Sequence, residues 1–202
     1  MPREGNLVKM AWFRTYPPEV LEWSFDAVVA SWDTASAANE TNDFSVCTLW
    51  GVKDNRYYLL RVYRERLEYP DLRRRILDVA HRRGVGRVLL EWADSGRNLF
   101  SDLAEFDRRS RYKVMKPKGS KEDRLAACSA IIEDGRVYLP ESADWLDAFL
   151  REVTGFPNAR HDDQVDSLSQ FLNHMRHQTG GRLKLSSEGR PKYERRRLRP
   201  RT

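Results

Sequence analysis

The chain has 202 residues, of which 40% are hydrophobic and 33% are charged. This length suits one domain with extensions. The balance of hydrophobic and charged residues excludes a disordered or membrane-embedded protein. No apolar run approaches about 18 residues, so neither a transmembrane helix nor a membrane partner is expected. The first ten residues lack the pattern of a secretory signal.

The net charge of +6 is unevenly distributed. Residues 176–202 hold ten Lys or Arg and two Glu, a net charge of +8, which leaves residues 1–175 with −2. A basic tail either attracts a polyanion, most simply nucleic acid, or is only a solvated extension. We expect an arm or linker over 1–24, a folded domain over 25–176 and a basic, disordered tail over 177–202.

Residues 1–25 are irregular, with two prolines and several aromatics, and predict an arm rather than an independent domain. Runs at 26–33, 42–52 and 56–64 then predict three strands, with Asp54-Asn55 as the turn of an antiparallel hairpin. Helices and strands follow in alternation: helix 69–83, strand 87–92, helix 99–109, strand 112–115, helix 121–132, a short edge strand at 135–140, helix 144–153 and helix 162–174.

This order predicts an α/β fold with a mixed β-sheet, an antiparallel hairpin plus parallel strands, flanked by helices on both faces. Ligands of such sheets bind beyond the carboxyl ends of the parallel strands. Cys47 and Cys128 lie in apolar runs, so we expect both to be buried and reduced. The chain lacks the close Cys and His spacing of a zinc site.

Three clusters of acids mark the ends of predicted elements. Asp33 closes the first strand of the hairpin-linked sheet, Glu91 closes the fourth, and Asp162 and Asp163 open the last helix. Carboxylates at the ends of buried strands are costly unless they are paired or metal-bound. On neighbouring parallel strands they would lie about 5 Å apart and repel each other without a cation. Such hard oxygen ligands suit Mg²⁺ or Mn²⁺.

Each cluster also has an ordinary explanation. Asp33 alone could end a strand at a turn, and Asp162 or Asp163 could cap a helix. Asp166 either shares the face of Asp162 and Asp163 or faces solvent, and Asp94 is either a reserve ligand or a turn residue. The occurrence of three clusters in one chain favours a metal site.

The motifs that hold these acids also carry a family resemblance, over about residues 23–175. They are Ser31–Ala35, Asn42–Val46, Leu89–Glu91 with Ser95-Gly96, Arg136–Pro140 and His161–Asp166. In this order and spacing they resemble the C-terminal nuclease domain of phage large terminase subunits. The resemblance implies an RNase H-like fold and a metal-dependent endonuclease that cuts double-stranded viral DNA during genome packaging.

The resemblance also implies a catalytic and metal-binding set of Asp33, Glu91 and Asp163, with Asp162 as the alternative to Asp163. Two Mg²⁺ or Mn²⁺ ions are expected, bridged by Asp33, with Glu91 and Asp163 each completing one site. His161 and Asp166 are candidate auxiliary residues.

DNA contacts are expected from Lys121 and Arg124, although an ordinary surface position at a helix start is the favoured reading of Lys121. The tail residues Arg195, Arg196 and Arg197 are further candidates. The implied partners are double-stranded DNA, the portal protein, the small terminase subunit and a separate packaging ATPase, because this sequence contains no Gly-x-x-x-x-Gly-Lys-Ser/Thr loop. The implied location is the host cytoplasm, transiently at the procapsid portal.

Two other functions fit the acid pattern. A Holliday-junction resolvase could use the same fold, but the spacing around Pro140 and His161 favours a terminase. A non-catalytic module that binds DNA or the portal would not need the complete set of acids.

Overall fold

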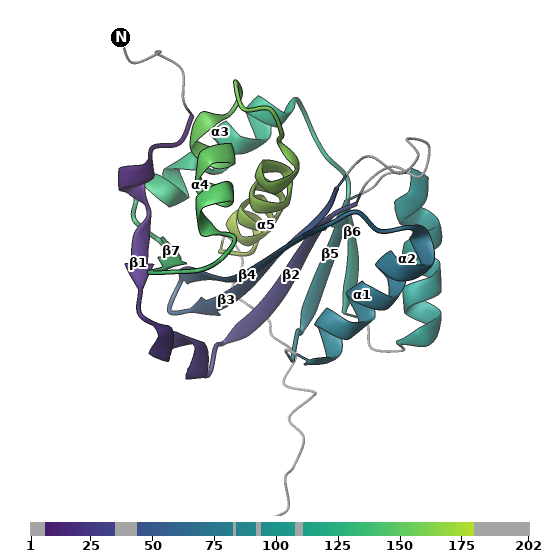
Figure 1. The fold of residues 1–202 in the computed structure, drawn as a ribbon. Coiled ribbons are helices and arrows are strands. Elements are labelled where there is room, and N and C mark those ends of the chain that lie inside the picture. The colour runs from purple at the N-terminus through teal and green to yellow at the C-terminus, as the bar shows by residue number, and fades with distance from the viewer. Residues whose placement is uncertain (1–6, 35–43, 83, 92–93, 108–110, 180–202) are drawn as a thin grey trace, which may run out of the picture.

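The computed structural model describes residues 7–34, 44–82, 84–91, 94–107 and 111–179. Within them, seven strands form one mixed sheet in the order β1-β7-β4-β3-β2-β5-β6 (Figure 1). The strands are β1 (Arg14–Tyr16), β2 (Ala27–Asp33), β3 (Ser45–Lys53), β4 (Arg56–Glu65), β5 (Arg87–Glu91), β6 (Tyr112–Met115) and β7 (Val137–Pro140). The helices are α1 (Tyr69–Arg82), α2 (Asp94–Phe106), α3 (Lys121–Glu133), α4 (Leu146–Gly155) and α5 (Asp163–Thr179), with 3₁₀ turns at Met10–Trp12 and Pro18–Glu22.

The middle of the sheet contains the predicted antiparallel hairpin, joined to parallel strands. Strand β3 pairs antiparallel with both β2 and β4, and β5 pairs parallel with both β2 and β6. The β3–β4 turn places Asp54 and Asn55 at φ values of 49° and 60°, the left-handed conformation that tight hairpin turns require. The predicted mixed sheet of an α/β fold is therefore confirmed.

Strand β7 is not the edge strand that the sequence predicts. Strand β1, from the arm expected to be irregular, pairs parallel with β7 and takes the edge position. The Tyr16 hydroxyl donates a hydrogen bond of 2.6 Å to the carbonyl oxygen of Leu59 and fixes this segment to the sheet. A strand of three residues is too short to produce a recognisable alternation, which explains why the sequence did not reveal it.

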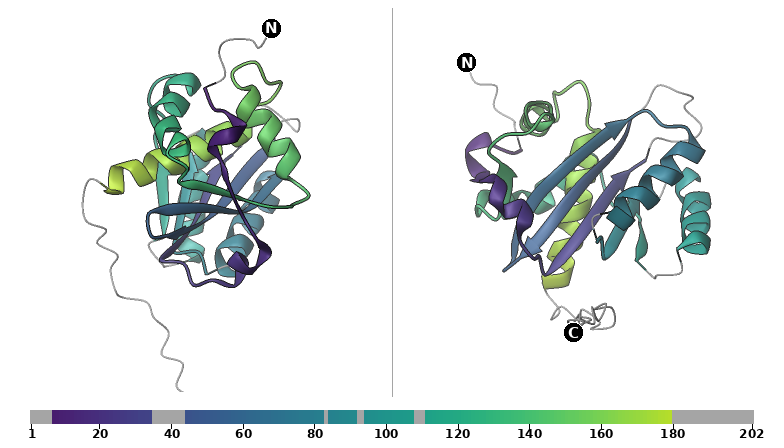
Figure 2. Two further views of the ribbon diagram at one scale, coloured as in Figure 1. Left: turned by 90° about the vertical axis from the view of Figure 1, so that its left-hand side faces the viewer. Right: turned by 60° about the horizontal axis from the view of Figure 1, so that its bottom comes forward.

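Helices cover both faces of the sheet, as predicted. Figure 2 shows α3, α4 and α5 on one side and α1 and α2 on the other. The first core contains Trp50 stacked on Phe171 of α5, with ring centroids 4.5 Å apart. The second core packs α1 and α2 against the opposite face. Both cysteines are free and buried, as expected, and among the described helices none is long and apolar enough to cross a membrane.

Candidate metal centre

Asp33 and Glu91 lie side by side at the carboxyl ends of adjacent parallel strands. The register pairs Trp32 of β2 with Leu90 of β5, so the next residue of each strand is one of the two acids. Adjacent strands are about 4.8 Å apart. Side chains alternate along each strand: Val29 and Leu89 belong to the core beneath α5. Asp33 and Glu91 follow them at even spacing and therefore also face α5.

Helix α5 is fixed to β2 by a buried hydrogen-bond cluster just before Asp33. The Ser31 hydroxyl donates to the carbonyl oxygen of Ser167 at 2.9 Å, and the Ser167 hydroxyl donates to the carbonyl oxygen of Ser31 at 2.8 Å. The side-chain amide of Gln170 donates to the carbonyl oxygen of Trp32 at 3.1 Å. These contacts hold the first turns of α5 over the end of β2, which the sequence alone did not reveal.

The first turn of α5 brings the third acidic cluster to the same place. Asp163 is partly buried, with 25% of its side chain exposed, and its carboxylate lies 3.7 Å from the Arg64 guanidinium. Asp166, one turn along the helix, is only 4% exposed. It therefore shares the inner face of α5, and the alternative that it faces solvent is wrong.

Two cations from α3 hold Asp166 and Asp162. The Lys121 ammonium lies 2.7 Å from a carboxylate oxygen of Asp162 and 2.7 Å from one of Asp166. The Arg124 guanidinium donates to the other oxygen of Asp166 at 2.6 Å. Lys121 is therefore part of the acidic centre, not the ordinary helix-start residue that the sequence favoured.

The capping box of α3 places these cations. The Ser120 hydroxyl accepts a hydrogen bond from the backbone NH of Asp123, whose carboxylate accepts one from the backbone NH of Ser120. This reciprocal pair fixes the start of α3. Lys121 and Arg124 are three residues apart and consequently lie on one side of the helix.

Burial and mutual repulsion raise the pKa values of the acids. Burial raises the pKa of Asp33 well above its usual range, and the charges of Glu91, Asp166 and Asp163 raise it further. Burial, followed by the charge of Asp166, raises the pKa of Glu91, although Arg124 and Lys121 oppose this. The acids thus form one coupled region of negative charge.

The pKa of Asp163 is also raised by burial, although the charge of Arg64 opposes it. Burial lowers the pKa of Lys121, but its hydrogen bonds to Asp162 and Asp166 outweigh burial and raise the pKa above its ordinary value. Lys121 therefore stays positively charged between these two aspartates.

This donor set fits a hard divalent cation in charge and chemistry. A cation beside Asp33 would relieve both the cost of burial and the repulsion from Glu91 and Asp163. Among the described residues, however, no three His, Cys, Asp or Glu side chains are already arranged as a metal-binding group.

A basic hollow of about 420 Å³ begins at Glu91 and extends between the β6–α3 connection, α3 and α5. Its lining includes Lys116, Lys118, Arg124, Arg176 and His177. The lysines and arginines among them lie on one side of the acidic centre, so the area around the site attracts anions although the site itself is acidic.

Asp94 and the three predicted tail residues cannot be placed relative to the site, whereas His161 lies near Asp163 and acts on its pKa. Asp94 begins α2, but its side chain lies outside the described residues. The tail residues Arg195, Arg196 and Arg197 also lie outside them. His161 is exposed and contacts the Phe44 ring edge-on, with centroids 6.2 Å apart.

The family model of the terminase RNaseH-like domain matches residues 30–175 of this chain. The chain belongs to the terminase RNase H-like domain family. The matched region includes Asp33, Glu91 and the start of α5, and thus all three acidic clusters of this terminase domain. A search of curated protein sequences finds no match.

Solved structures of phage terminases share the fold of this terminase domain. The large terminase nuclease of thermophilic phage G20c with bound magnesium has a TM-score of 0.66 at 16% identity, covering 85% of this chain and 98% of that one. The same nuclease with bound cobalt has a TM-score of 0.63 at 15% identity, with the same coverage. The large terminase of another thermophilic bacteriophage has a TM-score of 0.60 at 14% identity, and the match covers 83% of this chain but 44% of that one.

Proposed function

We propose that this terminase domain is a divalent-metal-dependent endonuclease that cleaves double-stranded viral DNA during genome packaging. The observation that carries the proposal is that burial raises the pKa of Asp33, Glu91 and Asp163, and that the charges of Glu91 and Asp163 both raise the pKa of Asp33 further. The family match supports the same activity.

Asp33, Glu91 and Asp163 would hold the metal, with two Mg²⁺ or Mn²⁺ ions expected. When bound, such ions polarise the phosphodiester and lower the pKa of the attacking water. Asp163 is preferred to Asp162 because its charge acts on Asp33, whereas the Asp162 carboxylate is paired with Lys121. Asp33 is the acid on whose pKa both Glu91 and Asp163 act, so it would be the residue that both ions share.

Lys121 and Arg124 have a positioning role in this proposal. Together they hold the two carboxylate oxygens of Asp166. Their charge lowers the pKa of Glu91 and so favours the ionised form that binds a metal. The basic hollow beside Glu91 would receive the DNA backbone through charge rather than base contacts, so cleavage should depend little on sequence and strongly on salt.

In packaging, the domain would act in the host cytoplasm at the procapsid portal, together with the portal protein, the small terminase subunit and a packaging ATPase. The large terminases of the family support this assignment; the match to the second phage's large terminase spans less than half of that chain.

Mn²⁺-dependent nicking of supercoiled plasmid tests the proposal. Asp33→Asn should lower the rate at least about 100-fold, because a neutral amide replaces the shared carboxylate. Asp134→Asn is the matched control, since it makes the same change at an exposed position after α3 and should leave the rate within about twofold. Equal rates for the wild type and Asp33→Asn would refute the proposal.

A further inference from the structure

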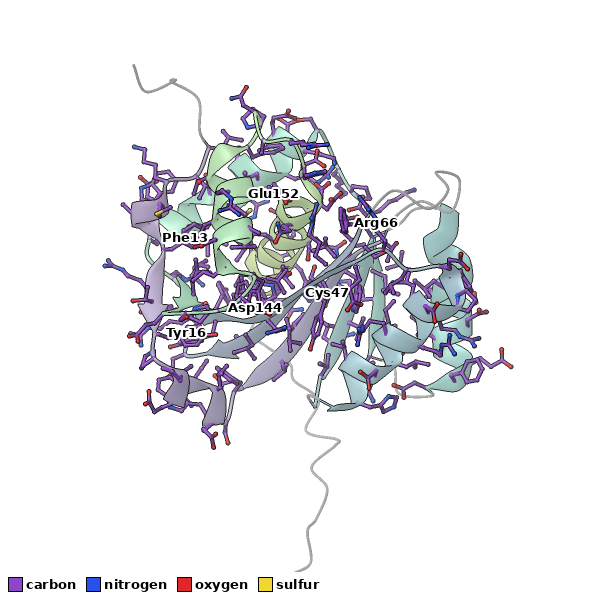
Figure 3. The ribbon with its side chains drawn as sticks, viewed as in Figure 1. Phe13, Tyr16, Cys47, Arg66, Asp144 and Glu152 are labelled. Atoms are coloured by element: carbon purple, nitrogen blue, oxygen red, sulfur yellow. The ribbon has the colours of Figure 1, made fainter. Side chains whose placement is uncertain are left out.

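A second basic hollow, of about 320 Å³, lies on the Asp163 side of the acidic centre. Its charged and polar lining consists of Arg64, Arg151, Glu152, Arg160, His161 and Gln164. Strand β4, helix α4, the connection into α5 and the first turn of α5 contribute these residues; Figure 3 labels Glu152 on α4. None of the three arginines belongs to the set of residues proposed above.

Arg64 lies in the same row of the sheet as the acids. The register pairs Asp33 with Val46 and Val46 with Arg64, so Arg64 is two strands away from Asp33, at about 10 Å. Val62 belongs to the core beneath α5 and Tyr63 packs against the opposite core. Strand alternation therefore directs Arg64 toward α5, as it does Asp33.

The Arg64 guanidinium has hydrogen-bonding capacity that the described part of the protein does not use. Its Nε and one terminal nitrogen are buried and have no hydrogen-bond partner there. The contact with Asp163, at 3.7 Å, is too long for a hydrogen bond. The group stacks on Phe44, 3.6 Å from the ring centroid, and Arg66 packs on the same ring at 4.3 Å. Buried donors without acceptors are rare, because leaving them unsatisfied is costly.

The remaining charges of the hollow favour an anion. Glu152 is its one acidic lining residue, and its two carboxylate oxygens accept hydrogen bonds from the backbone NH and the side-chain amide of Gln164, both at 2.6 Å. Arg151 and Arg160 are exposed, and neither forms an ion pair within the described residues. Three guanidinium groups therefore share the lining of the hollow with one carboxylate, which is already hydrogen-bonded, and the nearest carboxylate outside the lining is that of Asp163 beside Arg64.

We propose that this hollow is a phosphate subsite that binds the DNA backbone beside the cleaved bond. The inference rests on the proposed nuclease function. Guanidinium groups bind phosphate through paired hydrogen bonds, and Arg64 has donors available. Phosphates recur about every 3.4 Å of helix axis along a strand. Arg64, about 10 Å from Asp33, is therefore placed for a phosphate within about three nucleotides of the bond that is cut.

The two basic hollows lie on opposite sides of the acidic centre, which indicates where DNA would lie relative to the phosphate subsite. One begins at Glu91 and the other lies beside Asp163, with Asp33 between them in the sheet. A DNA strand that lies across the acids would thus meet positive charge on both sides. The phosphate subsite would bind the part of the DNA strand that lies over β4 and α4.

The salt dependence of DNA binding tests the subsite. Arg151→Gln/Arg160→Gln removes two charges from the hollow and leaves Arg64 in place beside Asp163. Arg56→Gln/Arg87→Gln is the matched control, because these residues start β4 and β5 at the sheet end away from the acids. Binding of a fluorescent 30-base-pair duplex (about three helical turns) would be measured by anisotropy in EDTA from about 50 to 200 mM salt.

The Arg151→Gln/Arg160→Gln protein, called the hollow variant below, should reduce the slope of log affinity against log salt by about 2, roughly 1 for each lost phosphate contact. The control pair should change the slope by less than about 0.5. Equal slopes for the two pairs would overturn the phosphate subsite.

Plasmid nicking by the same proteins separates this inference from the proposed function. The hollow variant should raise KM about tenfold with kcat within about twofold, the pattern of lost ground-state binding. If Asp33→Asn abolishes nicking but the two charge pairs behave alike, the subsite is wrong and the nuclease stands. If Asp33→Asn nicks like the wild type while the hollow variant still loses salt dependence, the nuclease assignment is wrong and the DNA contact stands.

Discussion

Ser31 of β2 and Ser167 of α5 each donate a hydroxyl hydrogen bond to the other's backbone carbonyl, at 2.9 and 2.8 Å. Both side chains are fully buried. Ser31 lies two residues before Asp33, and Ser167 lies four residues after Asp163. The reciprocal pair therefore joins the two elements that carry these acids and fixes how the start of α5 lies over the end of β2.

Ser167→Ala should destabilise the protein by about 1–3 kcal/mol, because it leaves the buried carbonyl of Ser31 and the backbone NH of Thr48 without this partner. Urea denaturation would measure the change. Ser129→Ala is the control, since that hydroxyl donates only to the Ala126 carbonyl of its own helix, and its effect should stay within about 0.5 kcal/mol. Equal effects of the two substitutions would show that the Ser31–Ser167 pair contributes little.

Asp33→Asn should stabilise the protein in EDTA at neutral pH. Burial first, and then Glu91, Asp166 and Asp163, raise the folded-state pKa of Asp33. The folded state therefore binds more protons than the unfolded state above the ordinary carboxylate range, so stability falls as pH rises through the raised pKa. Relative to that of Asp33→Asn, the melting temperature of the wild type should fall as the pH rises above about 4, the ordinary carboxylate range. Parallel curves would contradict the raised pKa.

A bound divalent metal should offset the destabilisation that the buried, ionised Asp33 causes at neutral pH. Binding at 100 times the Kd stabilises the folded state by about 2.7 kcal/mol, or about 5–10 °C in a chain of this size. Thermal melts with and without Mn²⁺ would detect such a shift in the wild type. Asp33→Asn should lose most of it, while Asp134→Asn should keep it. A full shift in Asp33→Asn would place the stabilising metal at another site.

Lys121→Gln should destabilise the protein by about 1 kcal/mol, since Asp166 is buried and keeps Arg124 but loses its second cation. The exposure of Lys121 limits the effect. Lys121→Arg should restore most of the stability, and Lys113→Gln, an exposed lysine of β6, should have little effect. Urea denaturation compares all three. A loss in Lys113→Gln as large as that in Lys121→Gln would point to general charge rather than the Asp166 pair.

The sequence predicted the sheet and two of the acids because both depend on local patterns. The apolar runs before Asp33 and Glu91 predicted strands that end in carboxylates, and the register places the two residues side by side. The order of elements predicted a mixed sheet covered on both faces. These features depend on strand alternation and chain order, which can be read from neighbouring residues.

The remaining features depend on contacts between distant segments. Ser31 and Ser167 are 136 residues apart, and nothing near either residue indicates the partner. The burial of Asp166 and its pairing with Lys121 require α3 and α5 to be packed together. Arg64 joins the row of acids through the β3–β4 register, which includes an irregularity at Leu49/Trp50 that simple counting from the turn would miss.

Anomalous diffraction from a crystal soaked in Mn²⁺ tests the central claim most directly. We expect two manganese peaks bound by Asp33, Glu91 and Asp163, with Asp33 contacting both ions and Lys121 still paired with Asp162 and Asp166. Manganese bound by Asp162 and Asp166 in place of Lys121, with none at Asp33, would contradict the claim.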